Sequence, residues 1–361
     1  MSEKNVATVL CIGDPHIQVT NILEVNMFIE CLINLATEKK PDLIVILGDV
    51  LHTHERVHTT ALNKAYEMIN NMRLISKTYV LVGNHDMINN QVFLNDNHWL
   101  CGMKEWENTV IVDRVITEII NGEKFVFTPY VPPGRIKEAL NTIGNEWKDA
   151  SCIFAHQEFA GCKMGAIISV EGDNWPLDYP HVVSGHIHSR QIPQKNIYYT
   201  GSAMQHAFGE SEKNIVAYLT FKDREYKREE IDFHLPRKKI IYMDVEDIDD
   251  YKVPTTNDQI KVTLSGNYDQ FKALKKTKKY KNLLDKGMKV VFKPKKITKK
   301  KIEINDDGKE TEVIDEIQNS STDFKSILDS IVNNCRDPYL VQAFELVVNG
   351  KEMDIDDVMF L

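Results

Sequence analysis

The sequence has none of the long apolar runs that mark a membrane-spanning protein. Its longest apolar runs, for example 43–47, are no longer than a strand, whereas a transmembrane helix needs roughly 20 apolar residues. No secretory signal is evident, because Glu3 and Lys4 precede an apolar stretch that already ends at Asp14. We therefore expect a protein that is neither secreted nor associated with a membrane.

Cysteine pairs are also missing. The six cysteines stand singly in the sequence, at Cys11, Cys31, Cys101, Cys152, Cys162 and Cys335. This pattern argues against a disulfide framework and against a thiolate zinc site. It favours free thiols and hence a reducing compartment, either the cytoplasm or the nucleoid or nucleus.

The chain has no overall excess of positive charge, since its net charge is −9. The charge is nevertheless uneven, because fourteen lysines and a single acid, Asp285, lie between Lys272 and Lys301. Such a segment fits either a basic surface on an acidic protein or a solvated helix face followed by an acidic linker. With 361 residues, 42% of them hydrophobic, the chain is an ordinary globular protein long enough for two domains.

The first two hundred residues alternate short apolar runs with amphipathic stretches. Runs rich in Val and Ile, separated by helical patterns, predict a layered α/β sheet that is covered on both faces. The expected strands are 6–12, 43–47, 78–82, 109–112, 125–128, 152–155, 182–184 and 197–199, and the expected helices are 22–37 and 61–74.

The remaining residues predict a smaller second unit and a tail. Strands at 240–245 and 260–264, a helix at 269–285 and a strand at 289–293 would form a small α+β sheet. Two short amphipathic helices, broken at Pro338, are expected near the end of the chain. The predicted organisation is a main domain over 1–236, a second domain over 237–294, a charged linker over 295–322 and a helical segment over 323–361.

Polar clusters follow the predicted strands of the main domain. The clusters are Asp14-Pro15-His16, Gly48-Asp49-Val50-Leu51-His52, Gly83-Asn84-His85-Asp86, His156 and Gly185-His186-Ile187-His188. The carboxyl ends of strands in an α/β sheet are where sites assemble, so we expect these loops to converge at the edge of a single sheet. Any one cluster alone is typical of a surface loop or turn, but their joint occurrence favours a shared site.

The residue types fit two metal ions. Oxygen and imidazole ligands without thiolates suit manganese, iron, zinc or magnesium rather than a soft metal. Two neighbouring cations need a shared carboxylate, and Asp49 is the natural bridge. The expected ligands of one ion are Asp14, His16 and His188, and those of the other are Asn84, His156 and His186.

These five clusters resemble the signature of the calcineurin-like metallophosphoesterases. Within that superfamily the chain is most similar to the SbcD-type nucleases of double-strand-break repair and their phage counterparts. The second cluster extends to His52 as it does in that branch, and the runs 199–202 and 208–210, Tyr-Thr-Gly-Ser and Phe-Gly-Glu, are similar to its motifs. Ala203 stands where the branch usually has proline.

The resemblance implies a layered β-sandwich flanked by helices, with a small α+β capping domain and a helical tail. It also implies two divalent cations, manganese foremost, with Mg²⁺, Fe²⁺ and Zn²⁺ as alternatives. His85 would protonate the leaving oxygen or stabilise the developing charge, and His52 would contact the phosphate or position the DNA backbone, while Asp86 would either orient His85 or cap a turn.

The implied function is an exonuclease or endonuclease that processes DNA ends in repair or recombination. The implied partners are DNA, an SbcC-type coiled-coil ATPase and a second copy of the chain. The tail at 323–348 would dock the ATPase or pack back on the main domain, and the segments 61–74 and 93–106 would form the dimer. Two rival functions remain: a phosphatase or phosphodiesterase acting on a nucleotide or phosphoprotein, and a catalytically silent scaffold, against which the complete ligand set argues.

Overall fold

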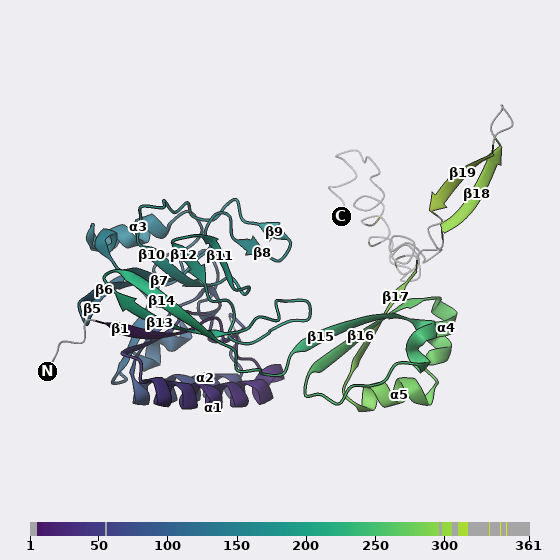
Figure 1. Cartoon of the computed structure of the whole chain (residues 1–361), viewed down its shortest axis with the longest axis horizontal. Coiled ribbons are helices and arrows are strands. Elements are labelled where there is room, and N and C mark those ends of the chain that lie inside the picture. Colours follow the sequence, from purple (N-terminus) through teal and green to yellow (C-terminus); the bar gives the residue numbers. More distant parts are fainter. Residues whose placement is uncertain are drawn as a thin grey trace. The chain divides into compact units, whose positions relative to one another are not determined.

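The computed structural model describes residues 6–54 and 56–295, the backbone of 298–304 and 310–316, and the single residues Val332, Leu340 and Phe344. The chain separates into two compact units (Figure 1). The first unit comprises Met1–Tyr242, Lys252–Thr263 and Asn282–Val290, and the second comprises Met243–Tyr251, Leu264–Lys281 and Val291–Leu361.

The first sheet of the main unit has six strands in the order β14-β13-β1-β2-β3-β4. Strands β1 to β4 are parallel neighbours, whereas β13 runs antiparallel to both β1 and β14. The strands are β1 (Ala7–Ile12), β2 (Leu43–Ile46), β3 (Lys77–Leu81), β4 (Thr109–Val112), β13 (Val216–Lys222) and β14 (Glu225–Ile231).

A second sheet of six strands lies against the first, in the order β11-β12-β10-β7-β6-β5. Its central strands β6, β7, β10 and β12 are parallel, and β5 and β11 run antiparallel at the two edges. The strands are β5 (Ile116–Ile120), β6 (Glu123–Phe127), β7 (Cys152–His156), β10 (His181–Gly185), β11 (Gln191–Gln194) and β12 (Ile197–Tyr199). A short hairpin pairs β8 (Lys163–Met164) with β9 (Ile167–Ile168).

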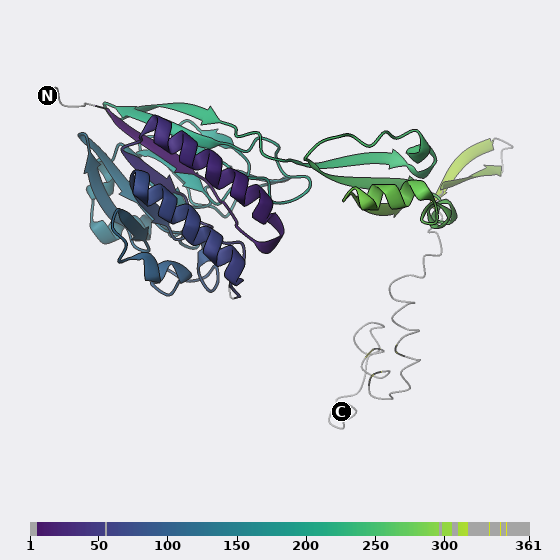
Figure 2. The ribbon, with the colours of Figure 1, turned by 90° about the horizontal axis from the view of Figure 1, so that it is seen from below.

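Successive side chains of a strand point to opposite faces of its sheet, which explains how the layers pack. In β1, Leu10 and Ile12 face the helices on the outside of the first sheet, while Val9 and Cys11 face the second sheet. Helices α1 (Ile22–Lys39) and α2 (Thr59–Ile75) run side by side over the first sheet, and α3 (Ile136–Leu140) packs on the second (Figures 1 and 2). This arrangement confirms the expected layered β-sandwich flanked by helices.

The helical stretch Val19–Lys39 is long and apolar enough to cross a bilayer by length and composition. Here it is a core element, because Val25, Phe28 and Leu32 are fully buried against the first sheet. Short 3-10 helices lie at Val19–Asn21, Asn84–Asp86, Trp99–Met103, Asn141–Ile143, Glu146–Asp149 and Val245–Asp249.

A three-stranded sheet follows, in the order β15-β16-β17, made of β15 (Lys238–Asp244), β16 (Gln259–Gly266) and β17 (Lys289–Pro294). The expectation of a single helix at 269–285 was wrong, because the structure has two helices, α4 (Tyr268–Leu274) and α5 (Lys278–Asp285). Thr277 separates them. Its hydroxyl donates to the Leu274 carbonyl at 2.8 Å and accepts from the Tyr280 amide at 3.2 Å, so it ends one helix and caps the next.

The segment 295–322, expected to be a charged linker, contains two antiparallel strands, β18 (Thr298–Ile304) and β19 (Glu310–Glu316). The polar composition that suggested a charged linker did not reveal these strands, in which β-branched residues such as Ile302 and Ile304 alternate with charged ones. The helical segment predicted over 323–361 lies outside the described residues, apart from Val332, Leu340 and Phe344. The predicted domain boundaries stay predictions.

Candidate metal centre

The structure brings all seven predicted ligands to one place, at the carboxyl ends of five strands. Those strands belong to both sheets: β1, β2 and β3 come from the first, and β7 and β10 from the second. The expectation that the loops of a single sheet converge was wrong in this respect. Two facing sheets present their carboxyl ends to the same edge of the sandwich, which sequence alone could not show because strand pairing is not a local property.

Asp49 lies between the two predicted ligand groups. Its Oδ2 is 3.4 Å from His16 Nε2 on one side and 3.2 Å from His156 Nε2 on the other. Its Oδ1 accepts a hydrogen bond from the His85 amide at 2.8 Å, which fixes the carboxylate in this orientation. One oxygen of Asp49 is therefore placed to be shared by two cations.

The first ligand group consists of Asp14, His16 and His188. Their ligand atoms lie within 4.8 Å of one another, and the Nε2 atoms of the two histidines are only 3.0 Å apart. Asp14 is fully buried; its Oδ1 accepts from the His186 amide at 2.8 Å, whereas its Oδ2 is buried without a hydrogen-bond partner.

The second group consists of Asn84, His156 and His186. The Asn84 Oδ1 is 3.0 Å from His156 Nε2 and 3.0 Å from His186 Nδ1. His156 Nδ1 donates to the Leu47 carbonyl at 2.6 Å, which leaves Nε2 as the nitrogen that faces Asn84 and Asp49.

These donor sets fit metal cations. A nitrogen ligand lies about 2.0–2.1 Å from Zn²⁺, so two adjacent nitrogen ligands of one ion are about 3 Å apart, as His16 and His188 are. A buried carboxylate oxygen without a partner is costly unless a cation compensates it, and Asp14 Oδ2 is such an atom. The role of these residues as ligands stays a prediction, but their placement is what two divalent cations require.

Burial and mutual charge set the pKa values of the centre. Burial opposes ionisation of Asp49, but His156 and His16 hold the pKa of this carboxyl well below its usual range. Burial alone lowers the pKa of His156, and the neighbouring Asp49 more than reverses this and raises it to about 9. Burial lowers the pKa of His186 to about 3 and that of His16 well below the usual value, so both rings are neutral and able to ligate.

Burial also raises the pKa of Asp14 to about 6. Because this value is still below 7, the Asp14 carboxyl is mostly ionised at neutral pH and adds a second negative charge to that of Asp49.

The two predicted catalytic residues, His85 and His52, flank the first group. The ring of His85 is edge-on to that of His16, with centroids 4.7 Å apart, and stacks with that of His52 at 5.7 Å. His85 Nδ1 donates to the His52 carbonyl at 2.7 Å, so Nε2 is its free nitrogen. Burial lowers the pKa of both rings.

Asp86 has a structural role. Its carboxylate accepts from the Gly83 amide at 3.0 Å, the Val50 amide at 3.2 Å and the Trp99 indole at 2.9 Å. Of the two roles considered for Asp86, the turn cap is the one these contacts support.

Several ligands have unusual backbone conformations. Asp14, His16, Asp49 and His186 have φ values of 40°, 43°, 49° and 78°, in the left-handed region that residues other than glycine seldom adopt. Residues held there cluster at functional sites. Gly83 permits the close approach of the loops, because a Cβ at this position would lie 2.2 Å from Asp49 Oδ1.

Sequence reasoning missed Glu210, whose Oε1 accepts from His188 Nδ1 at 3.2 Å. In the sequence, Glu210 stood out only as the last residue of the Phe-Gly-Glu run at 208–210. The ring of His206, a residue outside the predicted ligand set, packs against those of His16 and His188, with centroids 4.7 and 5.3 Å apart.

Comparison with known proteins identifies a family and two viral relatives. Residues 7–190 match the family described as "Calcineurin-like phosphoesterase". The chain is 46% identical over 304 residues to "Putative phosphoesterase 078R" of Invertebrate iridescent virus 3, covering 82% of this chain and 87% of the relative. It is 51% identical over 279 residues to "Putative phosphoesterase 244L" of Invertebrate iridescent virus 6, covering 75% of this chain and 98% of the relative.

Among solved structures, the phosphoesterase YfcE of E. coli is similar at 12% identity and a TM-score of 0.29, covering 63% of this chain and all of the other. This likeness is too distant to inform function.

Proposed function

Because the chain belongs to the calcineurin-like phosphoesterase family and is therefore a metal-dependent phosphoester hydrolase, we propose that it is a nuclease that cleaves phosphodiester bonds of DNA. The observation that carries this proposal is the pair of imidazoles outside the ligand set. His52 and His85 stack beside His16, so one edge of the centre holds two groups free to contact a phosphodiester.

The two cations, when bound, would lower the pKa of a water molecule to about 7, so that it can act as the nucleophile, and would stabilise charge on the phosphoryl oxygens. His85 is suited to hold and deliver a proton at Nε2, because its Nδ1 is occupied by the His52 carbonyl. We propose that His52, whose Nδ1 is 3.4 Å from His16 Nδ1, contacts the phosphate. Manganese is the cation that we propose for both sites.

Exposed lysines on the second unit support DNA as the substrate. Lys272, Lys275 and Lys276 on and just after α4 are all exposed. Lysines of this kind neutralise backbone phosphates and make DNA affinity fall steeply with salt.

We propose end processing in DNA repair or recombination, with an SbcC-type coiled-coil ATPase and a second copy of the chain as partners. The five cysteines within the described residues are free, which supports a reducing compartment, the cytoplasm or the nucleoid or nucleus.

The decisive experiment compares substrates under one condition. The purified chain is supplied with Mn²⁺ and tested on linear duplex DNA, single-stranded DNA and a small chromogenic phosphodiester. We expect cleavage of at least one DNA substrate with a higher kcat/KM than the small diester. Cleavage of the small diester alone would overturn the nuclease proposal and favour the rival function, a phosphatase or phosphodiesterase acting on a nucleotide or phosphoprotein.

A further inference from the structure

Glu210 makes contacts that link a predicted metal ligand to a turn of the backbone. Its Oε1 accepts from His188 Nδ1 at 3.2 Å, while its Oε2 accepts from the amides of His206 and Ala207 at 2.8 and 2.9 Å. One side chain thus fixes a ligand ring and closes the turn at 206–210.

The turn places His206 against the same ligand group. His206 Nε2 donates to the Asp14 carbonyl at 2.9 Å, and its ring packs edge-on against His16 and His188. Every member of the first group is therefore in contact with either Glu210 or the residue that Glu210 positions.

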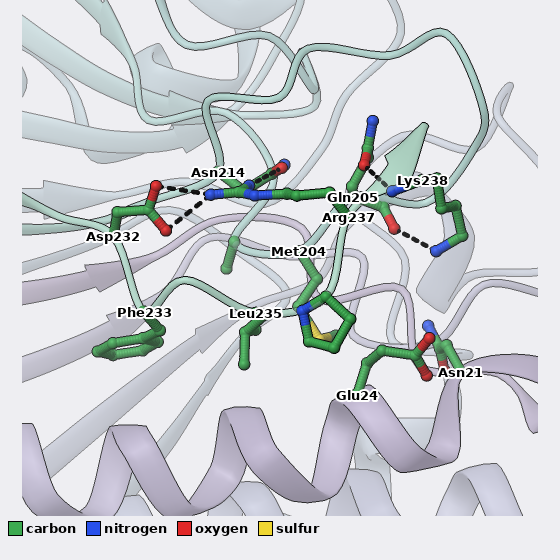
Figure 3. A pocket seen from close by; sticks show the side chains of 12 residues that line it. Asn21, Glu24, Met204, Gln205, Asn214, Asp232, Phe233, Leu235, Arg237 and Lys238 are labelled. Carbon is green, nitrogen blue, oxygen red and sulfur yellow. Dashed lines mark hydrogen bonds and ion pairs between the residues drawn. The ribbon is translucent and has the colours of Figure 1, made fainter. Parts of the chain in front are cut away.

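The turn is also anchored away from the metal centre. Gln205 Nε2 donates to the Glu210 carbonyl at 3.2 Å, and Gln205 is in turn bonded to Lys238 through its side-chain oxygen at 2.6 Å and its carbonyl at 2.7 Å (Figure 3). Beside it, Arg237 binds Asp232 with two hydrogen bonds and Asn214 with a third of 2.6 Å (Figure 3). This polar network keeps the 203–210 segment in place.

The second ligand group is supported differently. His156 is oriented by the Leu47 carbonyl, a backbone atom of the β2 end that a side-chain substitution does not remove. His186 and Asn84 contact each other directly at 3.0 Å. The two groups are thus unequal, because among the described residues only the first has a ligand ring that donates to a side-chain carboxylate outside the ligand set.

We propose that Glu210 is a positioning residue that sets the affinity of the cation held by Asp14, His16 and His188, leaving the other cation largely unaffected. By accepting from His188 Nδ1, it holds the ring in the tautomer whose Nε2 carries the lone pair for the cation. Removing an outer partner of a ligating histidine typically weakens metal affinity about 10- to 100-fold. The proposal rests on the binuclear centre and not on the identity of the substrate.

The test measures Mn²⁺ binding without any substrate. The metal-free Glu210→Ala variant is titrated with Mn²⁺ by calorimetry and followed by electron paramagnetic resonance. We expect one of the two sites to weaken about 10- to 100-fold while the other keeps its affinity. At intermediate Mn²⁺ the variant should show the six-line signal of isolated ions where the unaltered chain shows the signal of a coupled pair.

Two further variants make the test specific. Glu210→Gln keeps an oxygen that can accept from His188, so it should recover part of the lost affinity, and it also serves if the alanine variant fails to fold. Glu212→Ala removes an exposed carboxylate two residues away and should bind both ions as the unaltered chain does. Unchanged binding at both sites in Glu210→Ala and Glu210→Gln, or equal weakening of both sites, would overturn the proposal. Normal binding with no DNA cleavage in the unaltered chain would count against the nuclease proposal alone.

Discussion

Replacing Asp49 with asparagine tests whether one carboxylate is shared by both cations. Asp49→Asn keeps the shape of the side chain and an oxygen for the His85 amide, which lies 2.8 Å from Oδ1. It replaces Oδ2, the atom 3.4 and 3.2 Å from the Nε2 atoms of His16 and His156, with an uncharged amide group. Both cations should therefore lose the same ligand and the same negative charge.

The size of the effect follows from the charge. Two unit charges 4 Å apart interact by about 4 kcal/mol at an effective dielectric constant of about 20. A divalent cation bound at a shorter distance loses at least that much when the carboxylate is neutralised. Since about 1.4 kcal/mol corresponds to a factor of ten, we expect each site to lose roughly a thousandfold or more in affinity.

The assay is metal content after desalting, measured by elemental analysis on protein first equilibrated with Mn²⁺. The unaltered chain should retain two ions and Asp49→Asn close to none. Asp113→Asn is the matched control, because it neutralises a carboxylate that contacts a histidine, His98, outside the centre, and it should keep both ions. Two retained ions in Asp49→Asn would refute the idea that this residue is the bridge.

Three further predictions concern catalysis, protons and salt. His85→Gln should abolish turnover with nearly normal metal content, since its ring borders His16 but is not among the predicted ligands; full activity by a DNA cleavage assay would remove His85 from the mechanism. Because Asp49 raises the pKa of His156 to about 9, Mn²⁺ must displace a proton at neutral pH. Apparent affinity should then rise with pH up to about 9 and level off above it, and calorimetry in buffers of different ionisation enthalpy should detect the released proton; binding that does not change between pH 7 and 9 would contradict this. In the double variant Lys272→Ala with Lys276→Ala, the slope of log affinity for duplex DNA against log salt should become shallower by about 2, and an unchanged slope would exclude these lysines as phosphate contacts.

The sequence was most informative where short motifs follow buried strands. Asp14, Asp49 and Asn84 each come after a strand whose apolar residues predict it without reference to distant parts of the chain. Their convergence could be predicted because parallel strands place their carboxyl ends at one edge. Which sheet each strand joins could not, because pairing depends on partners far away in the sequence.

Other elements were missed for identifiable physical reasons. Strand β14 is largely exposed and rich in charged residues, so its sequence has no apolar pattern. Thr277 interrupts a stretch of otherwise good helix formers through a hydroxyl bond that a periodicity cannot reveal. Glu210 reaches His188 across 22 residues, and its role depends on that distant contact.

The left-handed backbone at Asp14, His16, Asp49 and His186 links the metal centre to the stability of the sandwich. Each such conformation costs on the order of 1–3 kcal/mol, and the packing of the two sheets around these loops must supply that free energy. A core substitution that lowers the free energy of unfolding should therefore also loosen the loops and weaken cation binding, even where it lies far from the ligands.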